Sequence, residues 1–241
     1  MISYLLTYQK RIIGINSIQR SFRDVNSAAE EYFVKGYGEK ASVGKGNPKI
    51  IESLFSKYKE AGSGKMEGDG ITLFFEHLGV NVASDPVVFL ISYYMDAKTM
   101  GFYTLEEFQT GMMKLGVSSI DDLRKKLPAL NQELNDKTKF KDLYKYVFEF
   151  SRDQGYKNIA IETAFALWQI LLSNKCLFLN DFIEFLQTEK KDQLVMQKDN
   201  WVMFLELVES TRGDFGNFVD DGCWNTMIEQ FSQYYARKYN K

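Results

Sequence analysis

Apolar residues along most of the chain recur every three to four positions, which is the spacing of a helix with one buried face. The pattern is clear in 50–58 and in 143–151. The same period predicts further helices near 86–95, 105–115, 119–127, 161–172, 178–188, 200–209 and 224–238. Strict alternation with a period of two, which indicates strands, is almost absent. The pattern therefore predicts an all-α fold in which any sheet is trivial.

Polar residues mark where some of these helices begin and where the chain divides. Thr104 with Glu107, and Ser118 with Asp121, fit the capping box, in which a hydroxyl and a carboxylate satisfy the first free N–H groups of a helix. Residues 36–47 are rich in glycine and small polar residues and are typical of a linker. We therefore predict a short segment over 1–35, a linker over 36–47 and a helical body over 48–241.

Composition excludes several classes of protein. The 241 residues carry 30 Lys and Arg against 32 Asp and Glu, and 45% are hydrophobic, which argues against disorder and against a whole-chain nucleic-acid binder. No run of about 18 apolar residues exists, so no membrane span is predicted. The first residues show no basic region before an apolar stretch, so no secretory signal is expected. Only two cysteines occur, which fits a reducing interior, and we expect a cytoplasmic or nuclear protein.

Side chains suited to catalysis are scarce. His77 is the only histidine, so it cannot form half of a two-histidine metal site, and we expect a partly buried structural residue. Cys176 and Cys223 lack an evident base and orienting group that would make either a nucleophile. We therefore expect no catalytic residue, no metal and no cofactor.

One loop has the outline of a calcium site but lacks its ligands. Asp96, Gly101 and Glu107 stand at the first, sixth and twelfth positions of an EF-hand loop. Lys98 and Met100 occupy two positions where calcium needs oxygen ligands. The front half of the body is therefore predicted to be EF-hand-like without binding calcium. A calcium sensor derived from an EF-hand and a generic helical adaptor remain as alternative functions.

Acidic residues gather near the C-terminus. Between Asp199 and Phe231 there are seven acidic residues and one basic residue, a local charge of −6. The segment is either the solvated face of a helix pair or a docking face for a basic partner. Trp201 and Trp224 lie within it, and spacing alone does not decide whether each is a core residue or an interface anchor.

Several short motifs in fixed order resemble the defective-in-cullin-neddylation (Dcn-like) family. They are Asp199-Asn-Trp201, Asp220-Asp-Gly-Cys-Trp224 and Met227-Ile-Glu-Gln-Phe231, preceded by Phe102-Tyr-Thr-Leu-Glu-Glu-Phe108, Gly111-Met-Met-Lys-Leu-Gly116, Phe140-Lys-Asp-Leu-Tyr144 and Ala166-Leu-Trp168. The resemblance covers about residues 48–238. It implies an all-helical potentiating-neddylation domain that binds no calcium. It also implies a non-catalytic accessory ligase that holds a cullin C-terminal winged-helix subdomain beside the charged conjugating enzyme.

The same resemblance implies two sites. The family's cullin-binding Asp, Ala and Asp match Asp199, Cys223 and Glu229, which we call the acidic patch. A second site takes the N-acetylated first methionine of the conjugating enzyme. The residues that match it, which we call the apolar set, are Val88, Ile91, Met95, Tyr103, Phe150 and Ile170, with Met100 in place of a polar residue common in relatives. An ordinary core is the alternative interpretation of the apolar set.

The N-terminal segment also contains a resemblance. Ile18-Gln-Arg-Ser-Phe22 and the stretch from Asp24 to Phe33 are similar to the second and third helices of a ubiquitin-associated (UBA) domain. Its usual Met-Gly-Phe-type loop is missing. This similarity makes ubiquitin a further candidate partner.

Overall fold

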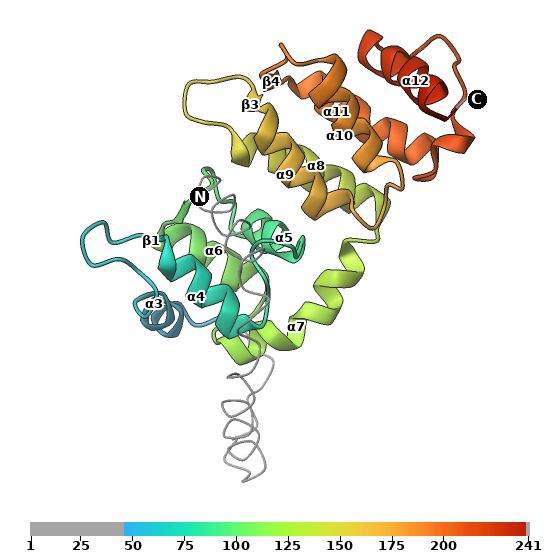
Figure 1. Cartoon of the computed structure of the whole chain (residues 1–241). Coiled ribbons are helices and arrows are strands. Elements are labelled where there is room, and N and C mark those ends of the chain that lie inside the picture. The colour runs from blue at the N-terminus through green and yellow to red at the C-terminus, as the bar shows by residue number, and fades with distance from the viewer. Residues whose placement is uncertain (1–45, 240–241) are drawn as a thin grey trace, which may run out of the picture.

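The computed structural model describes residues 46–239, and within them ten α-helices dominate over four two-residue strands (Figure 1). In chain order the elements are α3 Pro48–Phe55, β1 Met66–Glu67, α4 Asp69–Leu78, α5 Val87–Tyr94, β2 Phe102–Tyr103, α6 Leu105–Lys114, α7 Ile120–Glu133, α8 Lys137–Ser151, β3 Ile159–Ala160, α9 Ile161–Leu172, α10 Leu179–Glu189, β4 Val195–Met196, α11 Lys198–Ser210, the 3₁₀ helix η1 Phe215–Asn217 and α12 Thr226–Tyr239. The all-α prediction is confirmed. The predicted segment 1–35 and most of the linker lie outside the described residues.

The four strands form two antiparallel pairs, and each pair links two helical units of the chain. β1 and β2 pair antiparallel, with Met66 opposite Tyr103, and each directly precedes a helix of the front half. β3 and β4 pair in the same way, with Ile159 opposite Met196, just before α9 and α11. Helix–loop–helix units linked through their loops thus occur in both halves. The sequence had predicted such units for the front half alone, and their likeness to EF-hands stays a prediction.

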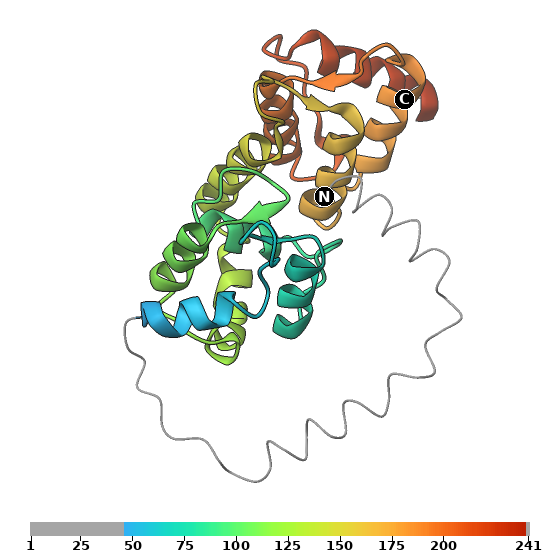
Figure 2. The ribbon, with the colours of Figure 1, turned by 90° about the vertical axis from the view of Figure 1, so that its left-hand side faces the viewer.

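The two halves are connected by long helices. Figures 1 and 2 show α3 to α6 in one group and α9 to α12 in another, with α7 and α8 running between them. α8 contacts α5 of the first group and α11 of the second. Within residues 46–239, no helix has the length and apolar character needed to cross a bilayer.

Helix boundaries follow local chemistry, with two corrections to the sequence predictions. Thr104 and Glu107 form the predicted capping box of α6. The second predicted box was wrong by one residue, because Ser119 caps α7 while the Ser118 hydroxyl accepts the backbone N–H of Asn47 instead. α7 also continues through Pro128, beyond the predicted end. Buried leucines on both sides of the proline pack into the core, which outweighs the loss of one helix hydrogen bond.

The periodicity did not predict α4, because two glycines stand at its start. Gly68 precedes the helix with a φ of 53°, and Gly70 lies in its first turn. A Cβ atom on Gly70 would lie 2.0 Å from the backbone oxygen of Tyr58. The glycine is therefore required by a close approach of two backbone segments, even though it weakens the sequence signal for a helix.

A cluster of aromatic rings forms the core of the second group. Trp201 is fully buried and stacks on Tyr144 at 4.4 Å and on Trp168 at 5.4 Å between ring centroids. The Trp201 indole N–H donates to the backbone oxygen of Tyr144, and the Tyr144 hydroxyl donates to the backbone oxygen of Trp201. Trp201 is thus a core residue, whereas Trp224 is only half-buried and its indole N–H donates to the backbone oxygen of Val219. These bonds fix the start of α11 against α8.

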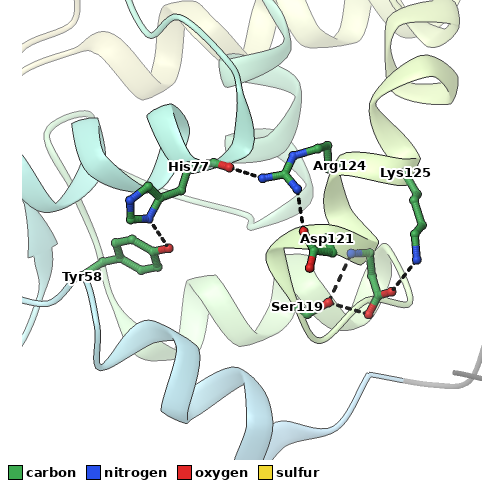
Figure 3. A network of polar contacts seen from close by, with 7 residues as sticks. Tyr58, His77, Ser119, Asp121, Arg124 and Lys125 are labelled. Carbon is green, nitrogen blue, oxygen red and sulfur yellow. Dashed lines mark hydrogen bonds and ion pairs between the residues drawn. The ribbon is translucent and has the colours of Figure 1, made fainter. Parts of the chain in front are cut away.

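His77 is part of a polar network that joins the turn after α3 to α4 and α7 (Figure 3). Its Nδ1 is 3.0 Å from the Tyr58 hydroxyl, and its backbone oxygen accepts a hydrogen bond from Arg124. Arg124 also pairs with Asp121 at 2.5 Å. The residue is exposed rather than partly buried as predicted, because it lies on the outer face of α4, where its ring meets the Tyr58 ring edge to face at 5.7 Å between centroids. Its hydrogen bonds nevertheless fit a structural role.

Candidate functional site

The first member of the acidic patch lies at the start of α11. Asp199 is the second residue of this helix and is exposed. No side chain caps the helix at Gln197, so the carboxylate of Asp199 lies near free N–H groups and the positive end of the helix dipole. Trp201, two residues later, is anchored in the core and fixes the position of this turn. The sequence therefore presents a carboxylate to solvent from a rigid support.

Cys223 and Glu229 lie before and within the first turn of α12, and both are exposed. The backbone N–H of Cys223 donates to the Asp221 carboxylate at 3.0 Å, which shapes the turn before the helix. α12 is held to the core by Met227, Ile228 and Phe231. Cys223 and Glu229 therefore share the start of one well-packed helix.

A pair of asparagines connects the starts of α11 and α12. The Asn225 amide donates from Nδ2 to Oδ1 of Asn200 at 2.9 Å. Oδ1 of Asn225 accepts the backbone N–H of Ile228 at 3.1 Å, as a helix-capping group does. Asn200 follows Asp199 directly, and Asn225 lies between Cys223 and Glu229. The structure thus brings the three predicted residues to one region, through two residues that sequence reasoning missed.

Most carboxylates of this region make no ion pair within residues 46–239. Among the described residues, no cation forms an ion pair with Asp199, Asp220, Asp221 or Glu229. Glu206, which belongs to the same acidic segment, is instead paired with Lys141 at 3.4 Å. Unpaired acids at two adjacent helix starts give a negative surface suited to a basic partner.

A hollow of about 360 Å³ borders Asp199. Glu149 lines it and pairs with Arg152 at 2.5 Å and with Lys198 at 2.7 Å. Partial burial acts to raise the pKa of Glu149, but its hydrogen bonds to Lys198 and Arg152 outweigh burial and hold that pKa below its usual value. The hollow therefore has mixed charge, whereas the acidic patch beside it is negative.

The apolar set lies in the interior. The relative exposure of Val88, Ile91, Met95, Tyr103, Phe150 and Ile170 is between 0% and 5%. Met100 is half-buried, and its backbone N–H donates to the oxygen of Phe150 at 2.9 Å. The Tyr103 hydroxyl lies 2.6 Å from that of Ser92, and burial raises the pKa of Tyr103 to about 12. In this structure the set is packed as core, and its role as a peptide pocket stays a prediction.

The carboxylates of the EF-hand-like loop are engaged within the protein. Asp96 pairs with Lys114 at 2.6 Å. Glu107 accepts the backbone N–H groups of Lys98 and Thr104 at 3.0 and 2.8 Å. Among residues 46–239, no group of three or more His, Cys, Asp or Glu side chains is arranged to hold a metal. Protein groups thus occupy the Asp96 and Glu107 carboxylates that a calcium ion would need as ligands. The contacts do not favour the calcium-sensor alternative.

A family model matches the part of the chain that contains these residues. The family model described as cullin binding matches residues 122–234, which include Asp199, Cys223 and Glu229. The chain is therefore similar, over α7 to α12, to a helical domain of the cullin-binding class.

Curated relatives extend the match toward the N-terminus. DCN1-like protein 5 of Bos taurus is 30% identical over 179 residues, covering 74% of this chain and 75% of the relative. DCN1-like protein 4 of Homo sapiens is 32% identical over 182 residues, covering 75% of this chain and 61% of the relative. DCN1-like protein 3 of Xenopus laevis is 30% identical over 187 residues, covering 76% and 61%. The chain belongs to the DCN1-like family.

Proposed function

We propose that this protein is a scaffold-type accessory ligase for cullin neddylation. It would bridge a cullin C-terminal winged-helix subdomain and the conjugating enzyme with an acetylated N-terminus, and so promote transfer of the ubiquitin-like modifier. The observation that carries the proposal is the acidic patch, whose unpaired carboxylates lie inside the segment matched by the cullin-binding model. Family membership supports the same role.

In this proposal the acidic patch binds a basic surface of the cullin. Asp199 and Glu229 supply charges at two helix starts, and Cys223 supplies a small contact near them. The glutamate is one methylene longer than aspartate, which a salt bridge to a flexible Lys or Arg side chain tolerates. Because Asn225 links α11 to α12, the two charges are positioned before the partner arrives, and little ordering is needed on binding.

Charge reversal tests this assignment. Asp199→Lys or Glu229→Lys is expected to weaken binding of a recombinant cullin winged-helix subdomain by about 30-fold, equivalent to about 2 kcal/mol, because an attraction becomes a repulsion. The matched control is Glu52→Lys on α3, an exposed acid without an ion pair in the described residues. Calorimetry gives the affinity, and circular dichroism checks the fold. Equal affinities for the reversed variants and the control would reject the acidic patch.

The apolar set is proposed to receive the acetylated methionine of the conjugating enzyme. A methionine side chain suits an apolar interior, and acetylation removes an amino charge whose burial is costly. Met100 is the one member that is only half-buried, so the peptide is expected to enter beside it. Entry would exchange core contacts for contacts with the ligand.

Peptide titrations test the second site. An acetylated N-terminal peptide of the conjugating enzyme should bind at least tenfold more tightly than the same peptide with a free amine. Met100→Gln restores a polar side chain at a half-buried position and should increase affinity through a hydrogen bond to the peptide backbone. Equal affinity of the acetylated and free peptides would reject acetyl recognition.

The mechanism needs no nucleophile from this protein, because the thioester belongs to the conjugating enzyme. Holding donor and acceptor together raises their effective concentration. Burial raises the pKa of Cys176 to about 12, so this thiol stays protonated at neutral pH and is a poor nucleophile. Action in the cytoplasm or nucleus, and ubiquitin binding by residues 1–35, which lie outside the described residues, are further parts of the proposal.

A further inference from the structure

A second pocket, which we call the basic pocket, lies at the opposite end of α11 from Asp199. Its volume is about 360 Å³, at the lower end of the range of about 300–1,000 Å³ found for small-ligand sites. α11 has 13 residues and is about 20 Å long, so this pocket is well separated from the acidic patch. The proposed function makes no use of it.

The pocket has an apolar floor and a basic rim. Phe140, Leu172 and Leu205 are buried and form part of the floor. Lys137, Lys175 and Arg212 also line it, whereas Glu209 is the one acidic residue in its described lining. Among the described residues, no carboxylate forms an ion pair with any of these three cations. The arrangement fits a ligand with an apolar group next to a negative charge.

Lys175 lies partly inside the pocket. Its ammonium nitrogen is 4.6 Å from the centre of the Phe140 ring and donates to the backbone oxygen of Leu134 at 3.1 Å. Burial lowers the pKa of Lys175. A carboxylate that reached this nitrogen would compensate for the solvation that the charge has lost.

Arg212 has a backbone conformation that its side chain disfavours. α11 ends in a Schellman motif, with hydrogen bonds from Arg212 to the oxygen of Glu209 and from Gly213 to the oxygen of Val208. The residue at the left-handed position of this motif is usually glycine, yet here it is arginine with a φ of 54°. α6 ends in the same motif with Gly116 at that position, with a φ of 68°. Strain that is retained in this way points to a use for the arginine side chain.

We propose that the basic pocket binds an acidic peptide segment of a protein partner, with a large apolar side chain on the Phe140 floor and the neighbouring carboxylate between Lys175 and Arg212. The size of the pocket admits one large side chain. Lys137 and Arg212 are exposed at the rim, where they can contact the peptide as it continues along the surface. A free small carboxylate would use only part of this arrangement.

The probes are three short peptides and one small molecule, titrated into the ¹⁵N-labelled full chain. N-acetyl-Phe-Asp-amide should give saturable shifts of the Lys175 and Gly213 amide signals. N-acetyl-Phe-Asn-amide, which lacks the charge, and N-acetyl-Ala-Asp-amide, which lacks the ring, should each bind at least tenfold more weakly. Equal binding of the Phe-Asn peptide would overturn the proposal, and phenylacetate that bound as tightly as the Phe-Asp peptide would overturn the assignment to a peptide.

Variants separate binding from folding. Arg212→Gly removes the cation and the strain, so peptide affinity should fall at least tenfold while the melting temperature stays equal or rises. Lys175→Met should also weaken binding. Lys191→Met, which changes an exposed lysine in the loop after α10, is the matched control. Unchanged affinity in Arg212→Gly would refute the proposal. Because cullin binding uses the other end of α11, Arg212→Gly should leave it unchanged, so this result is independent of the proposed function.

Discussion

Asn225 allows the link between α11 and α12 to be tested apart from the capping of α12. Its Oδ1 accepts the N–H of Ile228, and its Nδ2 donates to Asn200. Serine caps a helix about as well as asparagine, but its side chain is too short to reach Asn200. Asn225→Ser therefore removes only the link, whereas Asn225→Ala removes both the link and the cap.

The two substitutions are expected to differ in size. A hydrogen bond between neutral side chains contributes about 1 kcal/mol net, and an N-cap about 1 kcal/mol. Asn225→Ser should thus lower the free energy of unfolding by about 1 kcal/mol, and Asn225→Ala by about 2 kcal/mol. For a chain of this length the alanine variant should melt about 4–8 °C lower. Asn200→Ala should match the serine variant, because it breaks the same bond from the other side.

Urea denaturation measures how much the bond between Asn225 and Asn200 stabilises the fold, and cullin titration measures whether it positions the acidic patch. If the link positions Asp199 against Glu229, Asn225→Ser should weaken binding of the cullin subdomain about fivefold, which corresponds to about 1 kcal/mol. The matched control is Asn180→Ala, which breaks an amide pair with Gln169 between α9 and α10, away from the acidic patch. A serine variant with native stability and native affinity would refute this account of Asn225. A serine variant as unstable as the alanine variant would refute the separation of cap from link.

Three further substitutions test the packing and the charges that support the site. Tyr144→Phe leaves the buried Trp168 indole N–H without its acceptor at 2.7 Å and should cost about 2–3 kcal/mol in urea denaturation; a loss below about 1 kcal/mol would contradict this. Gly70→Ala should destabilise by at least about 2 kcal/mol because of its backbone overlap, whereas Gly62→Ala, which meets nothing within 4 Å, should be nearly neutral, and equal effects would argue against the overlap. The lowered pKa of Glu149 adds stability that is present above the usual pKa of 4.5 and is lost as the pH falls below it. Glu149→Gln should therefore reduce the fall in melting temperature as the pH drops below 4.5. An unchanged dependence of melting temperature on pH would show that the ion pairs of Glu149 do not stabilise the fold.

Strong periodicity made much of the fold predictable. The segment 161–172 has neither glycine nor proline, and the bounds of α9 agree with its prediction. α4 was missed because Gly70 is required by a close approach to the backbone of Tyr58, twelve positions earlier, which a local pattern does not contain. α7 exceeded its prediction for a similar reason, since burial on both sides of Pro128 depends on the rest of the fold.

The candidate sites were predictable only in part. The family resemblance predicted a patch of Asp199, Cys223 and Glu229, and that role stays a prediction. The hydrogen bond from Asn225 to Asn200, which links the two helix starts, joins residues 25 positions apart and has no sequence signature. The apolar set could not be assigned from sequence for a different reason. An apolar residue such as Ile91 follows the same helical spacing whether it packs in a core or lines a pocket. The basic pocket was not predicted at all, since its lining comes from α8, α9 and α11 and from the turns after α7, α9 and α11.

α11 shows how a buried core supports helix ends that are locally unfavourable. Its start has no side-chain cap at Gln197, and its end places Arg212 where glycine is preferred. Each feature costs about 1 kcal/mol relative to the best local choice. Between them, Trp201, Phe204 and Leu207 are fully buried, and burial of such side chains contributes about 1.5–3 kcal/mol each. The core thus holds the helix in place regardless of its ends, which leaves both ends free to present charge: a carboxylate at the start for the proposed cullin contact, and a guanidinium at the end for the proposed acidic peptide.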